Sequence, residues 1–164
     1  MIFGMPTYTF VHVVLSLMGF GSGLAVLGGL LAAHRLDGWT TVFFASLAAT
    51  DVTGFGFPFD RLLPSHIVGI VSLAAIALAC LARYVLHLRG AWRWIYALAA
   101  VVALYLDVFV LIAQAFLKVP ALHASAPTQT ELPFLVTQLV VLALFVLLAL
   151  AAAIKFRPQR ELAM

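Results

Sequence analysis

Titratable and amide side chains interrupt the long apolar stretches of this sequence, and they are the residues best suited to chemistry. The six are His12, Asp51, His66, Asp107, Gln114 and Gln138. Such a group is costly among apolar neighbours, and in membrane segments it commonly marks an ion path, a proton relay or a ligand site. We therefore expect these six side chains to line one polar pocket within an otherwise apolar protein.

The two histidines suggest that the pocket binds a redox cofactor. Neutral imidazole is a good ligand of haem iron and of transition metals, and two histidines on different helices form the smallest bis-histidine site. Arg61 and Lys118 are basic residues expected at the same end of the protein, where they would meet haem propionates. A b-type haem, or a metal ion, between His12 and His66 is thus the first functional hypothesis.

The two aspartates suggest a different function, in which the pocket conducts or transports an ion. No lysine or arginine lies deep in the segments that contain Asp51 and Asp107, so their partners would be histidines, hydroxyls, water or a bound cation. Gln114 follows Asp107 by seven positions, which places both on one helical face. Gln138 would add to the pocket from the last segment. The alternative hypothesis is a transporter or channel subunit for a small solute, an ion or protons.

A third interpretation assigns these polar groups a structural role only. Polar side chains on neighbouring membrane helices hydrogen-bond to one another and thereby specify packing, so the chain could be a structural or accessory subunit. No catalytic residues are predicted, because the sequence contains no nucleophile elbow, phosphate-binding loop or zinc-protease helix. The net charge of +3 comes from few cations at segment ends, which argues against a nucleic-acid partner.

The composition determines which kind of fold can position these residues. Of the 164 residues, 65% are hydrophobic and 9% are charged, whereas an average soluble domain has roughly 25% charged residues. So little polar surface requires lipid as the solvent, and backbone groups in lipid are satisfied only by helices or a closed barrel. The long leucine- and alanine-rich stretches favour helices. The sequence therefore predicts an all-α integral membrane bundle, with one transmembrane domain over residues 1–164.

Five stretches approach the length of about 20 residues that a membrane-spanning helix needs. They cover residues 7–33, 39–57, 64–87, 91–117 and 133–156. The second stretch differs from the others, since it is shorter, contains Asp51 and ends in the sequence Gly-Phe-Gly-Phe-Pro. The prediction is thus five transmembrane helices, with four helices and a re-entrant one as the alternative.

The distribution of basic residues favours five crossings over four. With five, seven of the nine lysines and arginines share one side of the membrane, and Arg61 and Lys118 share the other. With four, the division is six against three. Because cytoplasmic loops are enriched in lysine and arginine, we expect five spans, an N-terminus outside and a cytoplasmic C-terminus. On this topology the polar side chains gather in the outer half of the bundle.

Helical periodicity indicates which faces of two segments turn inward. The stripes are Tyr8, His12, Ser16, Gly19 and Gly23 in the first segment, and Ala100, Ala103, Asp107 and Gln114 in the fourth. Inward stripes of this kind would pack tightly on the cytoplasmic side and leave a polar pocket on the outer side. Gly19 and Gly23, four residues apart, allow close helix packing, either within the chain or in a homo-oligomer. The loop over residues 118–132 should be ordered only if it covers the pocket.

Three stretches of the chain resemble a group of short proteobacterial multi-pass membrane proteins for which no activity is known. They are GFGFPFDRLLPSHIVGIVSL at 54–73, GAWRWIYALAAVVALYLDVFVL at 90–111, and QAFLKVPAL with APTQTELPF within 114–134. The similarity extends over most of the chain. It implies a location in the bacterial inner membrane, and it assigns no functional residue.

Overall fold

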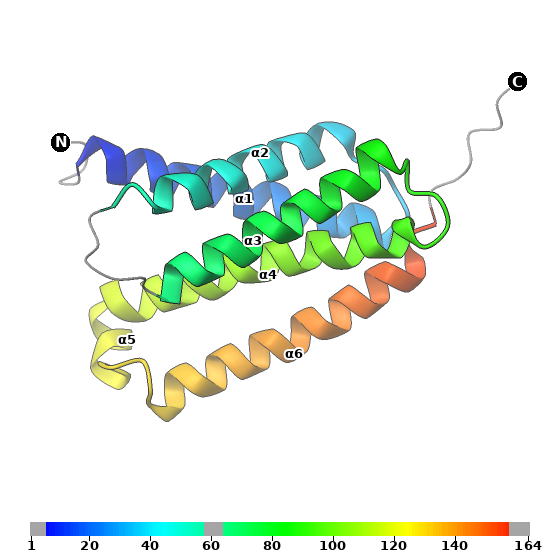
Figure 1. The fold of residues 1–164 in the computed structure, drawn as a ribbon. Coiled ribbons are helices and arrows are strands. Elements are labelled where there is room, and N and C mark those ends of the chain that lie inside the picture. Colours follow the sequence, from blue (N-terminus) through cyan, green and yellow to red (C-terminus); the bar gives the residue numbers. More distant parts are fainter. Residues whose placement is uncertain (1–5, 58–63, 158–164) are drawn as a thin grey trace, which may run out of the picture.

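The computed structural model describes residues 6–57 and 64–157, and every regular element in these ranges is a helix (Figure 1). The helices are α1 (Thr7–Leu31), α2 (Asp37–Gly54), α3 (Pro64–Cys80) with a π-helical extension η1 (Leu81–Val85), α4 (Trp92–Lys118), α5 (Pro120–Ser125) and α6 (Leu132–Lys155). The prediction of an all-α fold is confirmed.

The five long helices of the described chain run alternately in opposite directions along the bundle (Figure 1). α1 begins, and α2 and α4 end, at the end of the bundle where α5 lies, which we call the α5 end. We call the opposite end the basic end. Of the seven lysines and arginines in the described residues, only Lys118 lies at the α5 end. The six at the basic end are Arg35, Arg83, Arg89, Arg93, Lys155 and Arg157.

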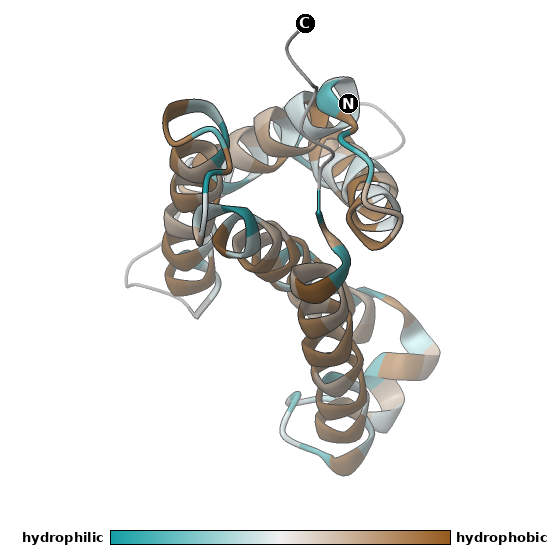
Figure 2. Ribbon diagram, turned by 90° about the vertical axis from the view of Figure 1, so that its right-hand side faces the viewer, coloured by the Kyte–Doolittle hydropathy of each residue, from teal (hydrophilic) through white to brown (hydrophobic). Residues whose placement is uncertain are grey.

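Four of the described helices are long and apolar enough to cross a lipid bilayer. They are Thr7–Leu31, Ser65–Val85, Trp92–Lys118 and Leu132–Lys155. These helices are predominantly hydrophobic along their length, and polar residues gather at their ends (Figure 2). α2 is shorter, with 18 residues, and contains two aspartates and four threonines. The four apolar helices suit a membrane protein, as the composition predicts.

Two of the predicted segments have different ends in the structure. α2 begins at Asp37, two residues before the predicted start, because an acidic side chain in the first turn stabilises the positive end of the helix dipole. It ends at Gly54, three residues before the predicted end. The segment predicted over 64–87 becomes π-helical in η1 and then turns, with a positive φ angle of 53° at His87.

Gly19 and Gly23 of α1 take part in a close contact between helices of the same chain. Both residues are buried. A Cβ atom added to Gly23 would lie 2.6 Å from Leu104 Cδ1 and 2.8 Å from Phe43 Cε2. The two glycines therefore serve the packing of α1 against α2 and α4. A second copy of the chain could reach them only by displacing α2.

An ion pair between a buried arginine and an exposed aspartate joins three helices at the basic end. Arg83, on η1, is 3% exposed. Its Nη2 donates to Asp37 Oδ1 of α2, and its Nη1 donates to the Tyr96 hydroxyl of α4 at 3.1 Å. The guanidinium also lies over the rings of Tyr84 and Tyr96, at 5.7 and 5.2 Å from their centroids, where cation–π attraction replaces part of its lost hydration. Arg83 thus holds the basic ends of α2, α3 and α4 together.

Tightly packed apolar side chains fill the bundle between the basic end and its middle. Phe43 and Leu47 of α2 and Leu104 of α4 are each 1% exposed and belong to one hydrophobic core. Val26 and Leu30 of α1 join the same core. This core separates the basic end from the polar residues in the other half of the bundle.

The connection between α4 and α6 is held by its own contacts. Ala126 is fully buried against two phenylalanine rings, one from each helix. The Glu131 carboxylate accepts hydrogen bonds from the Thr128 hydroxyl at 2.8 Å and from two backbone N–H groups. These bonds, above all the one from the Thr128 side chain, hold the pKa of Glu131 below its usual range. The loop does not depend on covering a pocket for its order, since none of the described residues 119–131 lines the cavity discussed next.

Candidate functional site

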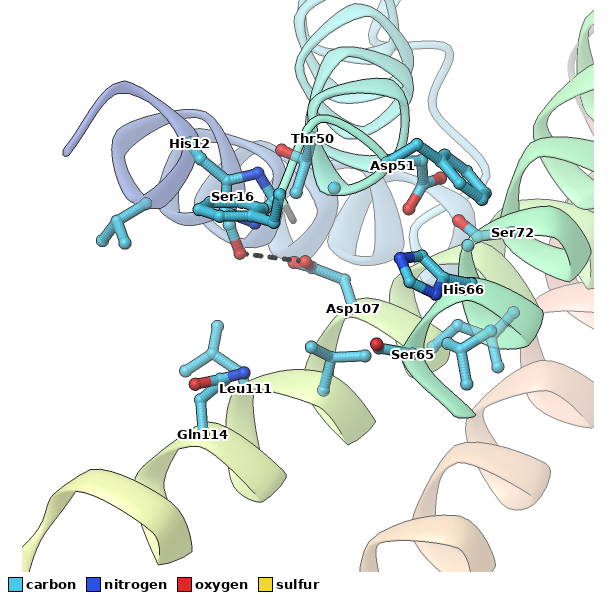
Figure 3. Close-up of a pocket in the computed structure, with 18 of the residues that line it drawn as sticks. His12, Ser16, Thr50, Asp51, Ser65, His66, Ser72, Asp107, Leu111 and Gln114 are labelled. Atoms are coloured by element: carbon cyan, nitrogen blue, oxygen red, sulfur yellow. Dashed lines mark hydrogen bonds between the residues drawn. The ribbon is translucent and has the colours of Figure 1, made fainter. Parts of the chain in front are cut away.

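A cavity of about 540 Å³ lies between α1, α2, α3 and α4, in the half of the bundle nearer the α5 end (Figure 3). Its size is that of a pocket for a small organic molecule, which typically measures about 300–1,000 Å³. Six of the predicted site residues line it: His12, Asp51, His66, Asp107, Gln114 and Lys118. They come from all four helices, so only helix packing brings them together.

One described residue of the predicted site does not line this cavity. Gln138 on α6 is buried, but its amide nitrogen donates to the carbonyl oxygen of Phe109 at 3.1 Å, away from the cavity. Gln138 stays apart from the cavity because α6 lies at the edge of the bundle and diverges from the other helices toward the α5 end (Figures 1 and 2). Arg61 lies outside the described residues.

Two carboxyl groups on different helices line the cavity, and each has an oxygen without a partner. Asp107 on α4 is 7% exposed, and its Oδ1 accepts a hydrogen bond from the Ser16 hydroxyl of α1 at 3.1 Å. Asp107 Oδ2 and Asp51 Oδ2 are both buried, and neither has a hydrogen-bond partner among the described residues. A buried polar atom left without a partner costs about 1–3 kcal/mol. Both oxygens are therefore candidates for contact with a ligand.

Ser72 on α3 adds a third group of this kind. The residue is 2% exposed, and its hydroxyl lies close enough to the Asp51 carboxyl to interact with it, but outside the geometry of a hydrogen bond. Ser72 and Asp51 lie close together, from α3 and α2 respectively (Figure 3). Because a hydroxyl can either donate or accept a hydrogen bond, Ser72 could bind a ligand together with the aspartates.

A hydrogen bond to α2 determines which nitrogen of His12 can accept a proton. His12 Nδ1 lies 2.9 Å from Thr53 Oγ1. The Thr53 hydroxyl already donates to the carbonyl oxygen of Ala49 at 2.7 Å, so it accepts from His12, and Nδ1 is the protonated nitrogen. Nε2 then retains a lone pair, which suits it to accept a hydrogen bond or to ligate a metal.

Two phenylalanines add aromatic rings to the cavity wall. Phe55 stacks on the His66 imidazole, with ring centroids 5.2 Å apart and ring planes 22° from parallel. Phe57 meets the His12 ring edge to face at 5.1 Å. The face of an aromatic ring attracts cations. The two rings, like the carboxyl groups, therefore favour a bound cation.

The two aspartates of the cavity have no counter-charge among the described residues. Asp51 and Asp107 lie within electrostatic range of one another, and neither forms an ion pair with a described cation. Lys118 also lines the cavity, but it follows Asp107 by 118 − 107 = 11 residues on α4. At about 1.5 Å per residue, the two Cα atoms are about 16 Å apart along the helix. Lys118 therefore belongs to the α5 end of the cavity, where its charge acts on His12, and it forms no ion pair with either aspartate.

A metal or haem at this site would depend on the two histidines. His12 from α1 and His66 from α3 both line the cavity. Within the described residues, no group of three or more histidine, cysteine, aspartate or glutamate side chains is arranged to hold a metal ion. The aspartates and the histidines therefore do not combine into one metal-ligand set.

The sequence prediction did not include Ser72, Phe55 or Phe57. A periodic signal for Ser72 exists, because Ser65, Gly69 and Ser72 follow one another at i, i+4 and i+7, the spacing of one helical face. All three line the cavity. The two phenylalanines have no such signal, since they follow the last residue of α2, where the path of the chain decides their direction.

No model of a known protein family matches the chain, and comparisons with curated proteins and with solved structures find no similar protein. The resemblance of three stretches to proteobacterial membrane proteins therefore stays a prediction. The cavity is therefore the feature of the molecule that bears on its function.

Proposed function

We propose that the chain crosses a bacterial inner membrane five times and binds a cation in the cavity, as a transporter or channel subunit for an ion or a small solute. The observation behind this proposal is the pair of buried oxygens, Asp51 Oδ2 and Asp107 Oδ2, which lack partners in the described chain and belong to residues of the cavity wall. A carboxylate removed from water needs a proton or a cation beside it. A bound monovalent cation would offset one of the two negative charges and contact the unpartnered oxygens.

The length and position of α2 support a fifth crossing. Its 18 residues extend for about 27 Å at 1.5 Å per residue, close to the hydrocarbon thickness of about 30 Å. α2 lies antiparallel beside α1 (Figure 1), and Phe43, Phe44 and Leu47 belong to the core shared by the bundle. We therefore interpret α2 as a membrane span and not as a re-entrant helix.

The charge distribution supports an orientation with the basic end in the cytoplasm. Six of the seven described lysines and arginines lie at that end, and cytoplasmic loops are enriched in these residues. Trp39, Trp92 and Trp94 lie near the same end, where aromatic rings suit the membrane–water interface. The cavity then belongs to the outer half of the protein.

Cation flux into proteoliposomes that contain the full chain tests the proposal. We expect saturable flux of at least one cation from a panel of protons, Na⁺, K⁺ and tetramethylammonium. Replacing both Asp51 and Asp107 by asparagine should lower this flux about tenfold or more, because a hydrogen bond to a charged group contributes about 1.5–3 kcal/mol and 1.4 kcal/mol corresponds to a factor of ten.

Glu131→Gln is the matched control, since it makes the same change from carboxyl to amide on a loop that does not line the cavity. Its flux should equal that of the unchanged chain. Undiminished flux through the double asparagine variant would refute the role of the two aspartates. The absence of flux for every cation in the panel would favour the structural interpretation instead.

A b-type haem or a metal ion between His12 and His66 is a second candidate, and one observation favours it. The two histidines line the same cavity, and the hydrogen bond from His12 Nδ1 to Thr53 leaves a lone pair on Nε2. The absorption spectrum of protein purified from haem-replete cells tests the haem. We expect a Soret band that disappears in both His12→Ala and His66→Ala if haem is bound, whereas a featureless spectrum excludes it.

A further inference from the structure

The dimensions of the cavity indicate which chemical class of cation it binds. This inference rests on the proposed function, cation binding in the cavity. An inorganic ion gives up its water only where several protein oxygens replace it, about six to eight in the case of Ca²⁺. The described residues hold no group of three or more histidine, cysteine, aspartate or glutamate side chains for such an ion. A cavity of about 540 Å³ is also far larger than one ion. Its volume fits an organic molecule.

Much of the cavity wall is apolar. Aliphatic side chains from three helices line it: Val13, Leu17, Val68, Leu106, Val110 and Leu111. An apolar group buried against such a wall is stabilised by about 25 cal/mol for each Å² removed from water. A sugar or another densely hydroxylated solute would instead lose hydration without finding hydrogen-bond partners here. The wall thus favours a ligand with an apolar body.

The polar part of the wall favours a cationic head on that body. Asp51, Ser72 and Asp107 come from three helices, and each has a buried oxygen without a hydrogen-bond partner in the described chain. Asp107 and Ser72 are 7% and 2% exposed, so water reaches them poorly. An anion would be disfavoured by the two aspartates, neither of which forms an ion pair with a described cation. A positively charged group satisfies all three residues.

The aromatic rings favour an ammonium group in particular. Phe55 and Phe57 line the cavity beside His66 and His12. Alkylated ammonium ions are weakly hydrated compared with metal ions, and proteins recognise them by placing them against aromatic faces. Carboxylates together with aromatic rings form a suitable environment for such a group.

We infer that the cavity binds a monovalent organic ammonium ion with an apolar body. Its head lies beside Asp51, Ser72 and Asp107, and its body contacts the aliphatic side chains of α1, α3 and α4.

Titration calorimetry with benzyltrimethylammonium tests this inference. The full chain is placed in nanodiscs of zwitterionic phosphatidylcholine, and empty nanodiscs correct for binding to lipid. We expect saturable binding of benzyltrimethylammonium, and no binding of K⁺ or of benzenesulfonate, which presents the same ring with a negative charge, at the same concentrations. Asp51→Asn and Asp107→Asn should each raise the Kd about tenfold or more, because each removes a negative charge beside the ammonium head in a poorly hydrated site. Glu131→Gln should leave it unchanged.

A second variant keeps the inference testable if an asparagine variant does not fold. Phe57→Leu preserves apolar volume but removes an aromatic face, and it should raise the Kd for benzyltrimethylammonium about threefold or more. The comparison of the three ligands on the unchanged chain requires no variant at all.

The possible outcomes separate this inference from the proposed function. Binding or flux of Na⁺, K⁺, protons or tetramethylammonium that depends on the aspartates, without binding of benzyltrimethylammonium, would overturn the inference and leave the proposed function in place. Binding of benzyltrimethylammonium that is equally strong in both asparagine variants would also overturn it. A chain that binds and transports no cation would overturn both.

Discussion

Replacing Gly23 by leucine is expected to lower the free energy of unfolding by about 3 kcal/mol, as overpacking of a tight core does. Even a Cβ atom at this position would lie 2.6 Å from Leu104 Cδ1 and 2.8 Å from Phe43 Cε2. Leu104 and Phe43 are each 1% exposed, so neither has open space to move into. α1 would have to shift away from α2 and α4. Unfolding in SDS, followed by tryptophan fluorescence, measures the effect.

Gly21→Leu is the matched control on the same helix. A Cβ atom there has no neighbouring atom within 4 Å, so the stability should change by less than about 0.5 kcal/mol. Equal destabilisation by the two leucines would contradict the packing described for Gly23. Because α1 supplies His12 and Ser16 to the cavity, Gly23→Leu should also abolish the binding of benzyltrimethylammonium, and Gly21→Leu should preserve it.

Asp37→Asn is expected to destabilise the protein by about 2 kcal/mol, because it leaves the buried guanidinium of Arg83 without a counter-charge. The Arg83 side chain is 2% exposed, whereas that of Asp37 is 75% exposed. The loss therefore comes from the buried arginine and not from the aspartate, which water can hydrate. Arg83→Met should cost less, because it removes the buried charge itself and fills the space with an apolar side chain.

A double-mutant cycle isolates this pair. In the Arg83→Met background, Asp37→Asn should cost only about 0.3–1 kcal/mol, the contribution of an acidic residue to the first turn of a helix. The free energy of unfolding in SDS is measured for all four proteins. If Asp37→Asn costs the same in both backgrounds, Asp37 does not compensate the charge of Arg83, and the ion pair contributes nothing to the basic end.

Gly23 and the Arg83–Asp37 pair both lie in the part of the bundle through which a transported cation would have to pass. Gly23, Phe43 and Leu104 lie in the core between the cavity and the basic end, and the Arg83–Asp37 pair ties α2 to η1 beyond that core. Passage of a cation from the cavity toward the basic end would require α1, α2 and α4 to separate at this core. Cation flux through the Arg83→Met variant would then measure whether the helices separate at the basic end.

Composition and residue type were sufficient to predict the class of protein and the identity of the central polar residues. Apolar stretches of about twenty residues can satisfy their backbone in lipid as helices, so four apolar helices follow from hydropathy alone. Asp51 and Asp107 were identifiable because carboxylates are rare within such stretches. The shared face of His12, Ser16, Gly19 and Gly23 could be predicted because residues at the helical spacing of about 3.6 lie on one face of a helix. In the structure, the two glycines of this face pack against neighbouring helices.

Which of these residues share a site was decided by packing. Gln138 is as polar as Gln114, yet it lies outside the cavity, because α6 diverges from α1, α2 and α3 and its glutamine meets the backbone of α4 instead. Arg83 resembles the other basic residues at helix ends in sequence, but Asp37 and Tyr96 surround it, and it is 3% exposed. Periodicity identifies the faces of one helix, whereas burial depends on the neighbour that covers each face, and that neighbour is defined only once the helices have packed.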